Sequence, residues 1–160
     1  MNKQETYEFL DNKNIEYEKL EHKAVYNMRE LSDIILPHPE AEAKNLFIRD
    51  DKKKNYYLIS VKGNKRIDLK SFRNIFKTRP LSFASEKDLL NKLHLTPGSV
   101  TPLGLLNNSE ADVAFYLDRE FLNPPETIAV HPNDNTATVY MNVNDLIRII
   151  KEHGNTVIVF

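Results

Sequence analysis

The segment Leu95-Thr-Pro-Gly-Ser-Val-Thr-Pro-Leu-Gly-Leu-Leu-Asn107 contains two of the four glycines and two of the eight prolines of the chain. Gly98 can adopt backbone angles that are closed to other residues, and Pro97 and Pro102 each fix one dihedral angle and remove one donor. This composition predicts a rigid loop whose backbone N–H and C=O groups point in fixed directions. Such a loop suits contact with a small polar group, although the same residues are typical of a plain helix-to-strand connection.

Strands and helices are both expected around this loop. Helices are predicted over residues 3–13, from Asn27 onward, around Leu69–Phe76, after a Ser85 cap, and between Asn142 and Gly154. Strands are predicted at residues 15–20, 44–50, 56–61, 81–84, 113–117, 127–131, 136–141 and 156–160. Several neighbouring strands are joined as hairpins, without regular strand–helix alternation. The pattern therefore favours an α+β fold in one domain over residues 1–160.

The composition excludes several classes of protein. The chain of 160 residues contains no cysteine, so disulfides, thiolate metal ligands and a cysteine nucleophile are excluded. No apolar run approaches the roughly 18 residues of a membrane span, and the N-terminus lacks an apolar signal region. We expect a cytoplasmic protein with no membrane partner. The formal net charge of −1 argues against indiscriminate nucleic-acid binding but leaves room for a local basic face.

Common catalytic motifs are missing from the sequence. The five histidines are scattered without a His-x-x-x-His pair, so no metal site is expected. No serine-hydrolase elbow, Walker loop or dinucleotide fingerprint occurs either. Polar groups next to predicted core strands are the remaining candidates. Lys44 opens a strand and His131 follows one, although a solvent-facing lysine and a turn histidine without a role are open alternatives.

Basic side chains are concentrated between residues 52 and 79, which contain ten of the 22 lysines and arginines. Such a concentration suits phosphate contacts, but a solvated surface explains it equally well. The candidate phosphate-binding residues in this stretch are Lys52, Lys53, Lys54, Arg73 and Arg79.

Three blocks of sequence together resemble the prolyl-tRNA editing domain family, also called the YbaK-like deacylases. They are Ala43-Lys-Asn-Leu-Phe-Ile-Arg-Asp50, Pro97-Gly-Ser-Val-Thr-Pro-Leu-Gly-Leu105 and Val130-His-Pro-Asn133. The resemblance covers nearly the whole chain and is closest to the free-standing members that hydrolyse alanyl-tRNA(Pro). It implies a mixed, curved sheet flanked by helices, an aminoacyl-tRNA substrate, prolyl-tRNA synthetase as a possible partner, and neither cofactor nor metal.

The resemblance also implies roles for individual residues. Lys44 matches the family's site lysine, His131 matches the histidine at the pocket rim, and Asn45 is a weaker substrate-binding match. The Gly-x-x-x-Pro loop that surrounds the aminoacyl carbonyl matches Gly98, Ser99, Val100, Thr101 and Pro102. The residues expected to size the amino-acid pocket are Val25, Met28, Leu31 and Phe47.

The chemistry implied by this family explains the missing motifs. An aminoacyl ester is activated by its neighbouring ribose hydroxyl, so rigid backbone dipoles and a positioned water suffice for hydrolysis. A cysteinyl-tRNA(Pro) deacylase of the same family and a non-catalytic module that binds tRNA or a synthetase are the alternatives.

Overall fold

The computed structural model describes residues 1–24 and 37–160. The helices are α1 (Lys3–Asn12), α3 (Leu69–Phe76), α4 (Glu86–Leu93) and α5 (Val143–His153), with short 3₁₀ helices η1 (Pro39–Ala41), η2 (Pro102–Asn107) and η3 (Arg119–Leu122). The strands are β1 (Tyr17–Glu21), β2 (Ala43–Asp50), β3 (Tyr56–Lys62), β4 (Leu81–Phe83), β5 (Val113–Leu117), β6 (Thr127–Val130), β7 (Ala137–Asn142) and β8 (Val157–Val159).

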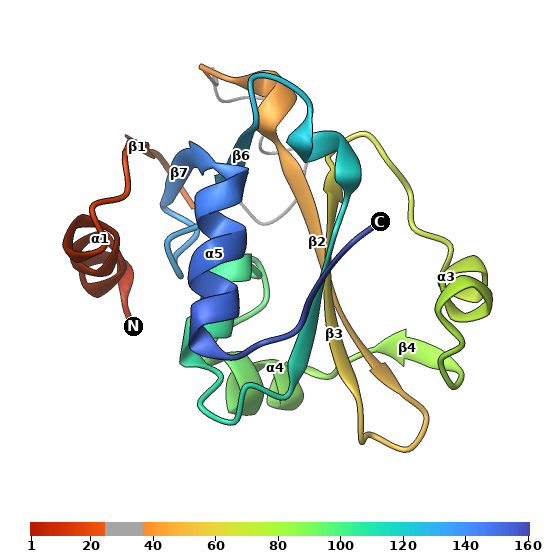
Figure 1. Cartoon of the computed structure of the whole chain (residues 1–160). Coiled ribbons are helices and arrows are strands. Elements are labelled where there is room, and N and C mark those ends of the chain that lie inside the picture. The colour runs from red at the N-terminus through yellow and green to blue at the C-terminus, as the bar shows by residue number, and fades with distance from the viewer. Residues whose placement is uncertain (25–36) are drawn as a thin grey trace.

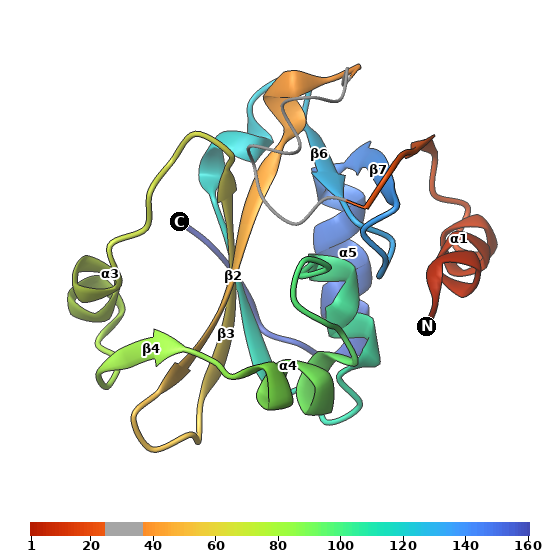
Figure 2. The ribbon, with the colours of Figure 1, turned by 180° about the vertical axis from the view of Figure 1, so that it is seen from behind.

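The strands form two hydrogen-bonded sheets. A five-stranded sheet has the order β4-β2-β3-β5-β8, in which β3, β5 and β8 run parallel and the other pairs are antiparallel. A three-stranded antiparallel sheet has the order β1-β7-β6. Helix α5 and the smaller sheet lie on one side of the larger sheet, and α3 lies on the other (Figure 1). The reverse view shows the same layers (Figure 2).

Each face of the larger sheet covers its own hydrophobic cluster. Phe47, Leu58 and Phe115 belong to the main core, together with buried residues of α4, α5 and the smaller sheet. Ile48 and Ile59, one residue further along their strands, belong to a second cluster under α3. This alternation follows from the two-residue repeat of a strand, and it decides which side chains of β2 reach the site.

Within the described residues the predicted elements agree closely with those observed, and the helix predicted from Asn27 onward lies outside these residues. Asn142 accepts a hydrogen bond from the backbone of Asn144 at the start of α5, and the helix ends at Gly154 with a φ of 113°. The α+β class is confirmed, and the strands form two sheets where the sequence suggested one. The 3₁₀ helix η2, directly after the Gly98 loop, was not predicted. No helix in the described ranges is long and apolar enough to cross a membrane.

Candidate active site

The Gly98 loop, residues 95–102, makes a tight turn between α4 and η2. Gly98 has a φ of 89°, a left-handed conformation in which a side chain would be strained. The backbone N–H of Ser99 donates to the Thr96 carbonyl at 3.1 Å, which closes the turn. Gly104 allows close packing within the segment, since a Cβ atom there would collide with the Leu95 side chain. The two glycines thus permit the turn and its close packing.

Two side chains fix this loop to the strands beside it. Thr101 is fully buried and donates through Oγ1 to the carbonyl of His131 at 2.7 Å. Asn45, on β2, donates through Nδ2 to the carbonyl of Val100 at 3.3 Å. The Asn45 Oδ1 atom accepts a hydrogen bond from the hydroxyl of Ser60 on β3. The loop is therefore held against both sheets by polar contacts.

Backbone donors of the loop remain available to a ligand. The N–H groups of Gly98 and Val100 donate to no other residue in the ranges 1–24 and 37–160. Both residues are half-buried and line a groove beside the loop. A carbonyl oxygen that becomes negatively charged in this groove would meet fixed N–H dipoles, which is the arrangement of an oxyanion-stabilising site.

A small pocket lies between the start of β2 and the strands of the smaller sheet. It is lined by Glu42, Ala43, Asn45, Ala129, Val130, His131, Thr138 and Tyr140. Its internal volume is about 40 Å³. Asn45 lines both this pocket and the groove, so the two hollows share one polar side chain.

His131 is held in one tautomer. Its Nδ1 atom lies 3.0 Å from the carbonyl of Ala137, which can only accept, so Nδ1 carries the proton. Burial lowers the pKa of His131, which keeps the ring neutral at pH 7. In the neutral ring Nε2 carries a lone pair and can accept a hydrogen bond from a water or a hydroxyl.

A second histidine, His22, contacts both the His131 ring and a residue that lines the pocket. The His22 Nδ1 atom lies 2.7 Å from the Lys23 carbonyl, and its Nε2 atom lies 2.8 Å from the hydroxyl of Thr138, which lines the pocket. The rings of His22 and His131 meet edge to face with their centroids 6.5 Å apart. No role was predicted for His22, Glu42, Thr138 or Tyr140, because no local motif marks residues that meet only across two sheets.

The groove beside the loop carries an exposed aromatic side chain. Phe83, on the edge strand β4, is 62% exposed and lines the groove together with Pro97 and Gly98. Phe47 lines the same groove, but it is buried and stacks on the Tyr56 ring at 5.7 Å. Phe47 therefore faces the groove and the main core; it does not line the small pocket.

Lys44 lies beside the site without lining it. It pairs with Val61 in the register of β2 and β3, and Val61 belongs to the cluster on the opposite face from Asn45. The Lys44 side chain makes no hydrogen bond or ion pair with residues 1–24 or 37–160. Strand alternation directs its ammonium away from the face that carries the pocket.

The candidate tRNA-binding residues lie away from the pocket. The exposed Lys52, Lys53 and Lys54 follow the far end of β2, at the tip of the hairpin with β3 (Figure 1). Arg79 pairs with Asp51 through Nε and Nη2, at 2.7 and 3.0 Å. The exposed Arg73 is part of α3, on the other side of the sheet. The predicted pocket residues Val25, Met28 and Leu31 lie outside the described residues.

No group of three or more side chains in the described ranges could hold a metal ion. The polar groups assembled here instead comprise a neutral imidazole, an amide and backbone donors around a rigid loop. Such a set can position a water and stabilise a developing oxyanion.

Comparison with known proteins gives the family of the chain. The family model of the aminoacyl-tRNA editing domain matches residues 22–149. The chain belongs to the aminoacyl-tRNA editing domain family. The Gly98 loop, Asn45 and His131 all lie within the matched range. As a member, the chain is an aminoacyl-tRNA deacylase, an ester hydrolase, in agreement with the resemblance seen in the sequence.

Individual relatives of this editing domain extend over most of its length. The prolyl-tRNA editing protein ProX of Acetoanaerobium sticklandii is 40% identical over 147 residues, covering 92% of this chain and 89% of the relative. The prolyl-tRNA synthetase associated domain-containing protein 1 of Danio rerio is 33% identical over 158 residues, covering 98% and 85%. A crystal structure of a candidate trans-editing enzyme for prolyl-tRNA synthetase shares the fold, with a TM-score of 0.72, 18% identity, and coverage of 98% of this chain and 95% of that one.

Proposed function

We propose that this editing domain is a free-standing deacylase that hydrolyses alanyl-tRNA(Pro). The choice of tRNA(Pro) is supported by the relatives, which include a prolyl-tRNA editing protein. The observation that carries the choice of alanine is the small pocket that shares Asn45 with the Gly98 loop. Its volume of about 40 Å³ suits a few small groups, since one water needs roughly 10–15 Å³ on this scale.

The ester carbonyl would lie against the Gly98 loop. The N–H groups of Gly98 and Val100 have no partner among the described residues. They would stabilise the charge that develops on this oxygen, each contributing roughly 3 kcal/mol to the transition state. Asn45 and Thr101 act by holding the loop in place. His131 would accept a hydrogen bond through Nε2 from the attacking water or from the 2′-hydroxyl of the terminal adenosine. Because that hydroxyl already activates the ester, no metal is required in this mechanism.

The groove beside the loop would hold the terminal nucleotide. Phe83 offers an exposed ring at the groove, and stacking of a base on an aromatic side chain contributes roughly 1–3 kcal/mol. Lys44 lies one residue from Asn45 and has no partner among the described residues. Its ammonium would bind a phosphate of the acceptor end, rather than the carbonyl.

Selection between alanine and proline would be steric. Alanine presents one methyl group beside its ammonium, whereas proline joins its nitrogen and side chain in a five-membered ring. A small hollow admits the first and excludes the second by clash, which can exceed the roughly 1–3 kcal/mol that one missing methylene provides.

Deacylation of alanyl-, cysteinyl-, seryl- and prolyl-tRNA(Pro) tests this function. We expect fast loss of alanine alone, reduced at least about a hundredfold in Asn45→Ala. Preferential loss of cysteine would retain the mechanism and replace the substrate by cysteinyl-tRNA(Pro). Binding of all four tRNAs without hydrolysis would refute the deacylase and favour a non-catalytic binding module.

A further inference from the structure

Tyr140 lines the small pocket, and its hydroxyl is buried without a partner in the described part of the chain. Tyr140 is 3% exposed, and its phenol oxygen has no hydrogen-bond partner among residues 1–24 and 37–160. A buried polar atom that is left unpaired costs about 1–3 kcal/mol, so native structures usually provide it with a partner. The Tyr140 hydroxyl therefore indicates a polar ligand group in this pocket.

An acidic residue, Glu42, lines the same pocket. Glu42 is half-buried, and burial raises the pKa of its carboxyl group. Its side chain forms no ion pair or hydrogen bond with the described part of the chain, whereas the nearby Lys62 ammonium donates to the Glu40 carbonyl. A half-buried carboxylate without a cation is costly, and a positively charged ligand would remove that cost.

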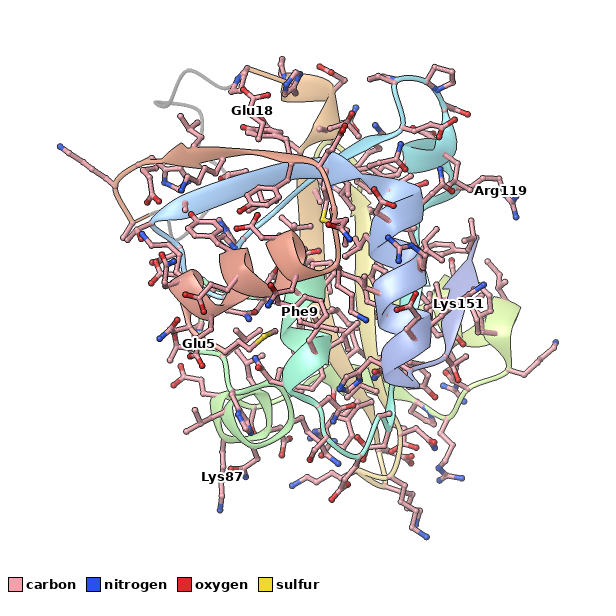
Figure 3. All side chains as sticks on the ribbon, turned by 60° about the vertical axis from the view of Figure 1, so that its left-hand side comes forward. Glu5, Phe9, Glu18, Lys87, Arg119 and Lys151 are labelled. Carbon is pink, nitrogen blue, oxygen red and sulfur yellow. The ribbon has the colours of Figure 1, made fainter. Side chains whose placement is uncertain are left out.

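Further acidic side chains near Tyr140 make the electrostatic potential around the pocket more negative. Burial raises the pKa of Tyr140 to about 12, and the negative charges of Glu42, Glu18 and Glu40 add to this shift. His38 packs edge to face on the Tyr140 ring at 5.1 Å, and its Nε2 atom lies 2.9 Å from the Glu18 carboxylate. Glu18 lies at the end of the molecule opposite Lys87 (Figure 3). The charges around this pocket thus favour a small cation.

We propose that this pocket is an ammonium subsite in which Glu42 and Tyr140 hold the free α-amino group of the aminoacyl ester. The Glu42 carboxylate would neutralise the ammonium, and the Tyr140 oxygen would accept one of its hydrogen bonds. Asn45 lines both this subsite and the groove beside the Gly98 loop, where the ester carbonyl would lie. The carbonyl carbon of the substrate is two bonds from its amino nitrogen. The inference rests on the proposed function and adds a requirement: the enzyme recognises a charged amino group, and not only a small side chain.

Comparison of two nearly isosteric substrates tests the subsite. Lactyl-tRNA(Pro) carries a hydroxyl in place of the ammonium of alanyl-tRNA(Pro). Each kcat/KM is divided by the rate of spontaneous hydrolysis, because the ammonium itself activates the ester. We expect the wild type to prefer the alanyl ester about 10- to 100-fold, the range of one hydrogen bond to a charged group. Glu42→Gln and Tyr140→Phe should each reduce that preference about tenfold, with lactyl hydrolysis nearly unchanged.

Matched controls separate this role from folding. Glu8→Gln removes an exposed carboxylate on α1, and Tyr57→Phe removes a hydroxyl on the other face of the sheet; both should keep the wild-type preference. Binding of a non-hydrolysable 3′-alanylamido-adenosine, compared with its lactyl analogue, gives the same ratio without turnover. Equal use of both esters by the wild type, or equally slowed hydrolysis of both by Glu42→Gln, would overturn the subsite and leave the deacylase standing. Failure of the folded wild type to hydrolyse alanyl-tRNA(Pro) would instead refute the proposed function.

Discussion

Asn45 and Val100 are joined across the site by a hydrogen bond of 3.3 Å from the Asn45 side chain to the Val100 carbonyl. The same side chain accepts from Ser60, so a single amide connects two strands of the large sheet to the Gly98 loop. Asn45 therefore helps to set the positions of the Gly98 and Val100 N–H groups.

Replacing Asn45 should therefore impair catalysis more than folding. We expect Asn45→Ala to lower kcat/KM for alanyl-tRNA(Pro) by about a hundredfold, the effect of misplacing an oxyanion donor. Single-turnover deacylation measures it, with Asn91→Ala, on the exposed face of α4, as the control. A decrease below threefold would show that the loop holds its geometry without this hydrogen bond.

Lys44 should contribute to binding rather than to the chemical step. Because strand alternation directs it to the face opposite Asn45, we expect Lys44→Ala to raise KM about tenfold and to lower kcat less than threefold. Lys44→Arg should restore most of the affinity, and the exposed Lys151→Ala should behave as wild type. A large fall in kcat with unchanged KM would instead assign Lys44 to the transition state.

His131 should determine the acidic limb of the pH profile. Since burial lowers its pKa from the ordinary 6.5, the ring stays neutral above that value and gains a proton only at lower pH. kcat/KM should therefore fall on the acidic side of pH 6.5, as the pH drops through the lowered pKa of His131. His131→Asn should be slower at every pH and lack this limb; an identical limb in the variant would exclude His131 as its source.

The tip of the β2–β3 hairpin carries three of the residues that the sequence suggests as tRNA-binding. Reversing the charges of Lys52, Lys53 and Lys54 to Glu should weaken tRNA binding. It should also reduce the slope of log Kd against log salt by about one for each phosphate that a lysine no longer neutralises. kcat at saturating tRNA should remain unchanged. Charge reversal of Arg148 and Lys151 on α5 provides the control. Unchanged affinity and salt dependence in the hairpin variant would remove this surface from the tRNA interface.

Asp118 should make the fold sensitive to acid. Burial alone would raise the pKa of this carboxyl group, but hydrogen bonds from the Lys62 and Glu120 backbone and from the Lys65 ammonium hold it below its ordinary 3.8. The unfolded chain therefore binds the proton first, and this stabilisation is present above about pH 4 and lost as the pH falls through the lower folded value.

The variant Asp118→Asn measures how much the charge of Asp118 contributes to the free energy of unfolding. Asp118→Asn should lower the free energy of unfolding at pH 7 by about 2 kcal/mol, because the buried donors lose a charged acceptor. Urea denaturation at pH 7 and pH 3 measures it, and the difference between the two proteins should shrink at the lower pH. A constant difference would mean that the charge of Asp118 is not the cause.

The sequence determined the local structure of this protein with few gaps. Turn residues, caps and periodicity located the strands and helices, because these signals depend on neighbours within a few positions. The blocks around Lys44, Gly98 and His131 also indicated the family. These signals could not reveal on which side of β2 each residue would act, since that depends on register.

Tertiary structure decided the composition of the site. Asn45, a secondary candidate in the sequence, became central because its face of β2 meets the Gly98 loop, while the adjacent Lys44 was directed to the other face. Glu42 and Tyr140 lie far apart in the chain and carry no motif, yet two sheets bring them to one pocket. That neither side chain has a partner among the described residues depends on packing, which the sequence does not show.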